Sequence, residues 1–347
     1  MEVTAQMVDR LTTIEMRWGG RSDRGVIPKL YDCASEKLGG KPISLVAAQR
    51  MIDNIKPGDN VFLVTGWACL PFLPRGETDG PLGIASLARA VKIGLGAFPI
   101  IVVGSRDMEP VCKTVEAGEM LVLDYDEAQK TSGAVATAIT FPVLNKEESR
   151  KFAADLIDEY KPVAAISVET AGPNQKGVKH VSFGHDVEAN DRLPSLECIF
   201  TEASARKILT IAVVDGGNEI GSGTIEECVK KIIPYAEVCQ CPCKSGIASV
   251  IRTDIVYPAA VANWGAYGIT AMIAYLLKNQ EILHDASIEQ RMLEADIRAG
   301  AFDAHYGRPC MSVDEADYKT CQAVVTILNK IIDSALKGKK VDRFDNK

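Results

Sequence analysis

Five acidic residues lie near the ends of predicted buried strands. Each stands at the end of an apolar segment or in the loop that follows it. They are Glu77, Asp79, Glu169, Asp215 and Glu219. In an open parallel sheet the carboxyl ends of the strands meet at one edge, and ligands bind there. We therefore expect the five carboxylates to lie close together, where a divalent cation, a cationic substrate group or shared protons would offset their repulsion.

A pocket of this kind supports acid–base chemistry, because burial and like charge move the pKa values of neighbouring carboxyl groups apart. All five residues are candidate catalytic groups, and the assignment of acid and base stays open. Asp79, Asp215 and Glu219 are also candidate ligands for a cation. Their oxygen atoms would favour Mg²⁺, Mn²⁺ or Ca²⁺ over zinc.

No nucleotide cofactor is expected from the glycine-rich segment that follows Asp215. The segment Gly216–Gly223 lacks the lysine of a phosphate-binding loop, and its glycines do not have the spacing of the dinucleotide-binding fingerprint. Taken alone, Asp215 suits a plain glycine turn, and Asp79, just before Pro81, suits a helix N-cap. Three acidic turns at equivalent strand ends favour a binding site over three separate structural roles.

Polar residues and glycines near these carboxylates are candidates for binding a small-molecule substrate. They are Arg75, Thr78, Gly172, His180, His185, Gly216, Gly217, Asn218 and Asn263. Both histidines lie in Gly172–Pro194, a long stretch rich in turn-forming residues that predicts a functional or mobile loop. Asn263 begins a long apolar helix, from which its amide could point into the site.

Three cysteines alternate with other residues in the segment Cys239-Gln-Cys241-Pro-Cys243. A structural zinc site needs four ligands and usually has the Cys-x-x-Cys spacing, so His180 or His284 would have to come from far along the chain. A catalytic cysteine would need a basic partner, which the sequence does not identify. We interpret the three cysteines as buried or half-buried thiols that flank a strand.

The elements that must position these residues alternate between short apolar runs and longer amphipathic segments. The runs expected to form strands are 61–65, 98–103, 120–123, 162–168, 209–214 and 246–257. The segments expected to form helices are 81–94, 146–160, 224–233, 258–277, 288–297 and 315–336. This alternation is typical of an α/β fold, a mostly parallel sheet flanked by helices in Rossmann-like layers.

The chain of 347 residues is long enough to bury a full core without disulfides or metals. We expect one large α/β domain over residues 41–336. An N-terminal extension, residues 1–40, is expected to pack on this core, and the polar tail, residues 337–347, to be frayed.

Charge and hydropathy exclude several classes of protein. The net charge is −7, from 39 basic and 46 acidic residues, which argues against a nucleic-acid binder and against a polybasic membrane-binding surface. The N-terminus lacks the apolar stretch of a secretory signal, and no apolar run approaches the ~20 residues that cross a bilayer. We therefore expect a cytoplasmic protein whose cysteines are reduced and unpaired.

An apolar run follows the first predicted strand and contains Trp67, Leu70, Pro71 and Phe72. It predicts either a lid that excludes water from the site or the interface of a homo-oligomer, and the sequence does not favour one over the other.

Several separated motifs resemble one known family. Glu77-Thr-Asp-Gly-Pro81, Asp215-Gly-Gly-Asn-Glu-Ile-Gly221 and Asn263-Trp-Gly-Ala-Tyr267 occur in the order found in the D-glutamate cyclase family, and Arg298-Ala-Gly300 is similar to the same family. The resemblance runs from about residue 66 to residue 314. It concerns the domain that forms the C-terminal half of the mitochondrial enzyme.

The resemblance implies a lyase that closes D-glutamate to 5-oxo-D-proline with loss of water and without ATP. Lactam closure needs a neutral amine and a carboxyl oxygen that can leave as water, so both a carboxylate base and a protonated or metal-polarised carboxyl group are required. By the resemblance, the residues in these roles are Glu77, Asp79, Glu169, Asp215, Asn218 and Glu219.

The chain departs from the family in the loop after Glu169. Where the family has arginines, this sequence has Thr170, Pro173 and Phe183. Dicarboxylates such as glutamate are usually held by arginine or lysine, so the departure favours a less anionic substrate. Two alternatives to the cyclase follow: a hydrolase of a cyclic amide such as a lactam or hydantoin, and a non-catalytic binder of small molecules or cations.

Overall fold

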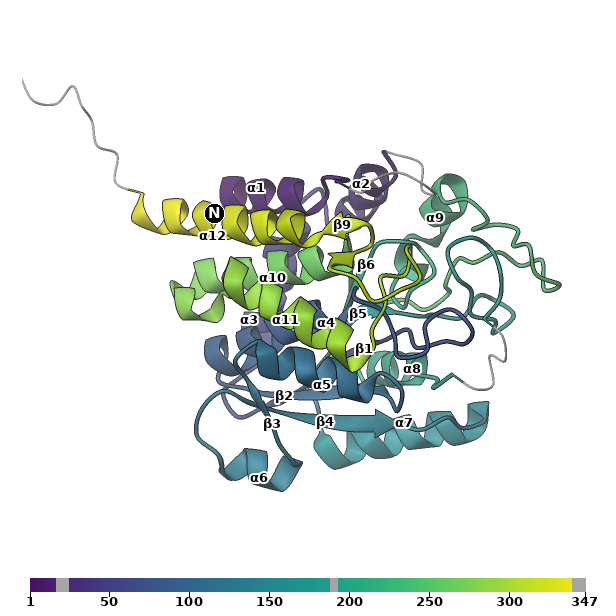
Figure 1. Cartoon of the computed structure of the whole chain (residues 1–347), viewed down its shortest axis with the longest axis horizontal. Coiled ribbons are helices and arrows are strands. Elements are labelled where there is room, and N and C mark those ends of the chain that lie inside the picture. Colours follow the sequence, from purple (N-terminus) through teal and green to yellow (C-terminus); the bar gives the residue numbers. More distant parts are fainter. Residues whose placement is uncertain (17–24, 188–192, 339–347) are drawn as a thin grey trace, which may run out of the picture.

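The computed structural model describes residues 1–16, 25–187 and 193–338 of the chain. At its centre is a seven-stranded sheet with the order β3-β4-β2-β1-β5-β6-β7, in which every pairing is parallel (Figure 1). The strands are β1 (Asn60–Gly66), β2 (Phe98–Gly104), β3 (Leu121–Val122), β4 (Val135–Phe141), β5 (Ala164–Thr170), β6 (Leu209–Val214) and β7 (Ile255–Pro258). The expected α/β fold with a mostly parallel sheet is confirmed.

Helices cover both faces of this sheet. They are α1 (Glu2–Thr12), α2 (Ile27–Lys37), α3 (Ile43–Asn54), α4 (Pro81–Arg89), α5 (Met108–Ala117), α6 (Tyr125–Lys130), α7 (Lys146–Tyr160), α8 (Glu197–Ala205), α9 (Glu226–Ile232), α10 (Ala262–Leu277), α11 (Ala286–Ala299) and α12 (Tyr318–Lys337). A π-helical turn, Ala90–Gly94, continues α4, and a short hairpin of β8 (Ser312–Val313) and β9 (Ala316–Asp317) precedes α12.

The core lies in two layers because side chains along a strand alternate between the faces of a sheet. In β1, Val61 and Leu63 join the apolar cluster that includes α4, α10 and α11, whereas Phe62 and Val64 join the cluster formed with α7 and α8. Figure 1 shows α5 and α7 on opposite sides of β4. Within the described ranges, no helix is both long and apolar enough to cross a membrane.

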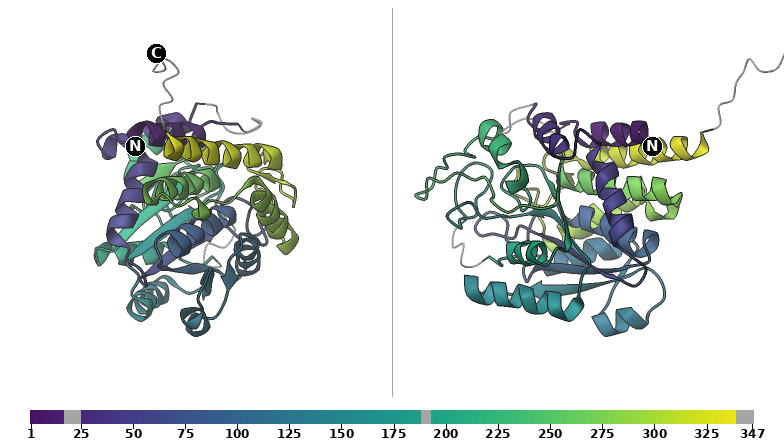
Figure 2. Two further views of the ribbon diagram at one scale, coloured as in Figure 1. Left: turned by 90° about the vertical axis from the view of Figure 1, so that its left-hand side faces the viewer. Right: turned by 180° about the vertical axis from the view of Figure 1, so that it is seen from behind.

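The N-terminal helices pack on the helical layer. Helix α1 contacts α3, α10 and α12, and both views of Figure 2 place it beside α12. The buried carboxylate of Asp9 on α1 accepts hydrogen bonds from the Tyr257 hydroxyl at 2.7 Å, the Ile43 backbone N–H at 2.7 Å and the Tyr31 hydroxyl. One side chain thus joins α1 to α2, to β7 and to the start of α3.

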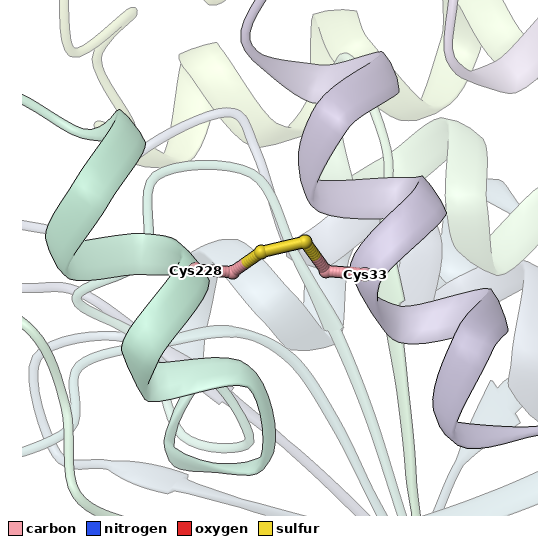
Figure 3. The surroundings of a disulfide bond; sticks show 2 residues. All are labelled: Cys33 and Cys228. Carbon is pink, nitrogen blue, oxygen red and sulfur yellow. A yellow bond between two sulfur atoms is a disulfide. The ribbon is translucent and has the colours of Figure 1, made fainter.

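A disulfide joins Cys33 of α2 to Cys228 of α9 (Figure 3). The expectation that the cysteines are unpaired is therefore wrong for these two residues. They are 195 residues apart in the sequence, and only the packing of α2 against α9 brings them together.

The strand predicted over 246–257 is wrong for most of its length, because only its last residues, with Pro258, pair in the sheet. The preceding residues form irregular chain that hydrogen-bonds to two loops: the Ser249 N–H donates to the Gly217 carbonyl at 3.2 Å, and the Val250 N–H donates to the Pro173 carbonyl at 3.0 Å. The helix predicted from 258 begins at Ala262, since Pro258 still belongs to β7.

Other predicted elements are close to those observed, and several observed ones were not expected. Both ends of the helix predicted at 146–160 are confirmed. At its N-terminus, Asn145 and Glu148 form a reciprocal cap. No element was predicted for β4, where only part of the strand is fully buried, or for α1–α3, α5, α6 and α8. The tail predicted to be frayed lies outside the described residues from position 339 onward.

Replacing Asp9 by alanine should destabilise the protein, because it removes an acceptor shared by donors from three other elements. The Ile43 N–H would be left buried without that partner, so we expect a loss of about 2 kcal/mol or more in the free energy of unfolding, measured by urea denaturation. Gln6→Ala, at an exposed position of the same helix, is the matched control. Equal stability of the two variants would contradict this role of Asp9.

Candidate active site

The acidic residues gather where the order of the strands reverses. From β1 the chain moves to β2 on one side, and after β4 it returns to β5 on the other side of β1. Open α/β sheets bind their ligands at such a switch point, outside the carboxyl ends of the strands. The loops after β1, β5 and β6 emerge on the side to which the β4 arrow points in Figure 1.

Asp79 and Asn263 cap each other's helices at this switch point. The Asp79 carboxylate accepts from the backbone N–H groups of Ala262 and Asn263, both at 2.7 Å, and so caps α10. The Asn263 side-chain oxygen accepts from the N–H groups of Gly80 at 2.9 Å and Gly83 at 2.6 Å, and so caps α4. Capping by Asp79 was expected, but for the helix that follows it in sequence rather than for α10.

The loop that carries Glu77 and Asp79 is fixed by hydrogen bonds of Thr78, the residue between them. Thr78 donates its hydroxyl to the Ser312 carbonyl at 2.9 Å, and its own carbonyl accepts from the Asn263 amide at 2.9 Å. Gly80 has φ +108°, and a Cβ there would lie 2.3 Å from the Thr65 hydroxyl, so this turn needs glycine. Thr78 and Asn263, both predicted as substrate-binding, therefore also position Asp79.

The turn after β6 wraps around the side chain of Glu219. Its carboxylate accepts from the N–H groups of Gly216 at 2.5 Å and Gly217 at 2.7 Å, and from the Ser222 hydroxyl at 3.1 Å. These glycine amides, predicted to face a substrate, are thus bonded to Glu219. Burial, followed by repulsion from Asp215, raises the pKa of Glu219 to about 7.

Glu77 and Glu169 differ from Asp79 and Glu219 because each has a carboxylate oxygen without a hydrogen-bond partner in the described structure. Both side chains are 6% exposed, and Oε1 of Glu77 and Oε2 of Glu169 have no hydrogen-bond partner within the described parts of the chain. Burial raises the pKa of Glu77 well above its usual value, and repulsion from Asp79 and Asp215 adds to the effect. Burial and repulsion from Asp215 and Glu219 raise the pKa of Glu169 in the same way.

Glu169 also has a strained backbone. Its φ of +45° lies in the left-handed region, which is unfavourable for a residue with a side chain. Such strain persists only where the surrounding structure enforces it, and it is common at functional sites. Directly after Glu169, the Thr170 carbonyl accepts from the Ile220 N–H, and the Gly172 N–H donates to the Asn218 carbonyl.

Two groups of carboxylates have a geometry that can hold a cation. Their oxygen atoms lie within 4.8 Å of one another in the groups Asp79, Asp215, Asp314 and Glu169, Asp215, Glu219. Asp215 belongs to both groups. The ligands predicted from sequence, Asp79, Asp215 and Glu219, are thus divided between two overlapping sets.

Three residues near the site were missed by the sequence analysis. Asp314 lies in the β8–β9 turn, whose strands are too short to show a periodic pattern. His305 lies 3.9 Å from Asp314, close enough for an ion pair when its ring is protonated. Asp107 follows β2, so the rule that acidic residues follow strand ends could have found it.

Other predicted site residues lie away from the carboxylates. The Arg75 side chain is half exposed and pairs with Glu109 at 2.8 Å, although it lines a small hollow with Glu77 and Asp79. His185 is exposed, and the ring of His180 lies against the three alternating cysteines instead.

The loop after β1 contacts the loop after β5. The residues after β1 form a turn in which the backbones of Cys69 and Leu73 exchange hydrogen bonds at 2.7 and 2.6 Å. Trp67 of this turn packs with Val181 and Val187 in a small apolar cluster, and Phe72 contacts the ring of Phe183. These contacts join the apolar run after β1 to the loop after β5 within one chain. The roles of this run as a lid or as an interface both stay predictions.

Two comparisons relate this chain to known proteins. The sequence profile of the family described as "D-glutamate cyclase-like, C-terminal" matches residues 34–329. The human protein "D-glutamate cyclase, mitochondrial" is 28% identical over 214 residues, which are 59% of this chain and 30% of the human protein. The match therefore spans about a third of the length of that curated relative.

The buried carboxyl group of Asp107 should make the stability of the protein depend on pH. Burial raises its pKa from 3.8 to about 7, so between these values the folded state holds a proton that the unfolded state releases. The contribution of Asp107 to the free energy of unfolding is then greatest at low pH, and we expect this contribution to fall by about 2 kcal/mol as the pH rises from about 5 to 7.

Asp107→Asn keeps the acceptor that receives the Trp67 and Ala68 N–H groups but removes the titration. Urea unfolding at several pH values should show a shallower decline of stability for Asp107→Asn than for the unmodified protein. The exposed Asp53→Asn should behave like the unmodified protein. Parallel pH profiles for all three proteins would contradict the prediction.

Proposed function

This chain belongs to the D-glutamate cyclase-like family, and on that premise we propose that it is a hydro-lyase that closes an amino acid to a lactam with loss of water, or catalyses the reverse hydration. D-glutamate and 5-oxo-D-proline are the pair that the family resemblance favours. The proposed site is the acidic cluster at the β1–β5 switch point.

One observation carries the proposal: Glu77 and Glu169 are buried, have raised pKa values and each keep an oxygen without a partner within the described parts of the chain. A carboxyl group with a raised pKa can be protonated near neutral pH and can donate that proton to a leaving oxygen. Asp79, by contrast, accepts backbone hydrogen bonds that stabilise its charged form. Glu219 also accepts several hydrogen bonds, and these limit the rise of its pKa to about 7.

The reaction balances with acid–base groups alone. The amine nitrogen forms a bond to the side-chain carboxyl carbon, one carbon–oxygen bond of that carboxyl group breaks, and the two protons lost by the ammonium group leave with the oxygen as water. Carboxylates at the site would take the first proton from nitrogen and deliver a proton to oxygen. We propose that the apolar run with Trp67 and Phe72, which packs on the loop after β5, acts as a lid that excludes bulk water from this dehydration.

We also propose that a divalent cation of the Mg²⁺, Mn²⁺ or Ca²⁺ class binds at Asp215. This residue belongs to both oxygen clusters, and such oxygen sets suit hard cations. A cation there would offset the repulsion among the carboxylates and polarise a substrate carboxyl group.

A second candidate function is suggested by the partners of two basic side chains, Arg75 and Lys179. Arg75 pairs with Glu109, and Lys179, which is 5% exposed, pairs with Glu197 at 2.9 Å and donates to the Pro194 carbonyl. Both therefore have carboxylate partners of their own. This arrangement favours a less anionic substrate, and the second candidate is a hydrolase that opens a neutral cyclic amide at the same carboxylates.

Glu77→Gln and Glu169→Gln should each lower kcat by about 100-fold or more, because glutamine keeps the shape but neither takes up nor releases a proton. Turnover of D-glutamate, L-glutamate and 5-oxo-D-proline, followed by chiral chromatography, measures the effect. Glu116→Gln, on the surface of α5, is the matched control.

The substrate panel separates the candidates. Turnover of D-glutamate that both variants lose supports the cyclase, whereas opening of neutral lactams or hydantoins without activity on D-glutamate supports the hydrolase. If neither variant changes a measured turnover, catalysis at this cluster is wrong.

Addition of Mg²⁺, Mn²⁺ or Ca²⁺ at pH 8 should raise Tm by a few degrees, because a cation that binds only the folded state stabilises it by RT ln(1 + L/Kd), where L is the concentration of free cation. Asp215→Asn should remove this increase, and the exposed Asp53→Asn should keep it. A Tm that does not respond to any of the three cations would contradict a cation site at Asp215.

A further inference from the structure

We propose that this protein contains a structural zinc site formed by His180, Cys239, Cys241 and Cys243. The four donor atoms lie within 4.8 Å of one another. The site is separate from the acidic cluster and does not depend on the proposed reaction.

The distances among the donors suit one small tetrahedral ion. Nε2 of His180 lies 3.2 Å from the Cys241 sulfur and 3.5 Å from the Cys243 sulfur, and the Cys239 sulfur lies 3.4 and 3.3 Å from those of Cys241 and Cys243. Zinc bonded at its usual lengths separates two sulfurs by roughly 3.8 Å and a sulfur from a nitrogen by roughly 3.6 Å. A shift of a few tenths of an ångström therefore converts the cluster into a Cys₃His site.

The orientation of His180 is that of a metal ligand. Its ring is fully buried, and Nδ1 lies 3.2 Å from the Val178 carbonyl, the arrangement in which Nδ1–H donates to that oxygen. The lone pair of Nε2 then faces the three sulfurs. Ligating histidines characteristically donate their other N–H to a carbonyl in this way.

Hydrogen bonds join the segment that carries the three cysteines to the segment that carries His180. The Asn174 amide, 2% exposed, donates to the Gly246 carbonyl at 2.7 Å and to the Cys243 sulfur at 3.4 Å. Lys176 donates to the Cys243 carbonyl at 2.8 Å, and the Gln240 N–H donates to the Gly184 carbonyl at 2.8 Å. Three thiols gathered around an imidazole in a fixed scaffold suit Zn²⁺, which prefers sulfur and nitrogen. With all four positions taken by protein, the ion would be structural rather than catalytic.

The zinc site would brace the acidic turn. The carbonyl of His180 accepts from the Asn218 amide at 2.8 Å, and Asn218 lies between Asp215 and Glu219. The Asn218 carbonyl in turn accepts from the Gly172 N–H at 2.9 Å. Zinc would therefore fix residues 171–187, which follow Glu169 and β5, against the turn after β6 that carries Asp215 and Glu219.

Metal analysis of the full-length protein, purified without chelator, tests the proposal. Inductively coupled plasma mass spectrometry should find about one zinc per chain. Cys241→Ser and Cys243→Ser should lose it, whereas Cys112→Ser, at a free cysteine of α5, and Asp215→Asn, in the acidic cluster, should retain it. If Asp215→Asn loses zinc and Cys241→Ser retains it, the ion binds at the carboxylates, and the proposal is wrong.

Two measurements on the unmodified protein keep the test decisive if the cysteine variants do not fold. Replacement of zinc by Co²⁺ should produce the visible absorption of a tetrahedral ion together with thiolate charge-transfer absorption in the near ultraviolet. Addition of a strong chelator should make three further thiols reactive and increase hydrogen exchange in residues 174–187 and 239–250. A folded protein with no zinc, no thiolate–cobalt absorption and no chelator effect would show that these are ordinary thiols.

Discussion

Repulsion among carboxylates buried at one edge of the sheet is the constraint on which the arrangement of the site depends. The fold compensates it unevenly. Asp79 accepts from the first N–H groups of α10, so backbone dipoles stabilise its charge. Glu219 accepts from the glycine amides of its own turn, which offset only part of its burial and of the repulsion from Asp215, and its pKa stays raised to about 7. Glu77 and Glu169 each keep an oxygen without such a partner in the described structure, which makes them the groups that can exchange protons.

The same edge is reinforced by contacts between segments far apart in sequence. Reciprocal capping by Asp79 and Asn263 fixes α4 relative to α10, while the Asn218 amide connects the acidic turn to the loop that carries His180. In the zinc proposal the three cysteines extend this connection to a further loop. The protein would then have two ion sites of different class: a zinc site of sulfur and nitrogen ligands for rigidity, and an oxygen site at Asp215 for chemistry. The Asn218 amide links the two regions.

Much of the site could be predicted because carboxyl ends of parallel strands share an edge. Glu77, Asp79, Glu169, Asp215 and Glu219 all follow strands that short apolar runs made recognisable. Asp107 obeys the same rule, because it lies between the end of β2 and the start of α5. Asp314 could not be found in this way, since it reaches Asp79 and Asp215 from a hairpin of two-residue strands. The irregular chain before β7 was mistaken for a strand because apolar residues pack equally well in a buried loop.

The α/β class, most central elements and the acidic turns at strand ends could be predicted from the amino-acid sequence, because they follow from local periodicity and chain direction. The tertiary structure alone decided which helix Asp79 caps, which cysteines are paired and which residue completes the Cys239–Cys243 cluster. Each of these depends on side chains brought together across long stretches of chain: 61 residues from His180 to Cys241, 183 from Asp79 to Ala262 and 195 from Cys33 to Cys228. Spacing along the sequence carries no record of such contacts, which arise only when the layers of the fold pack together.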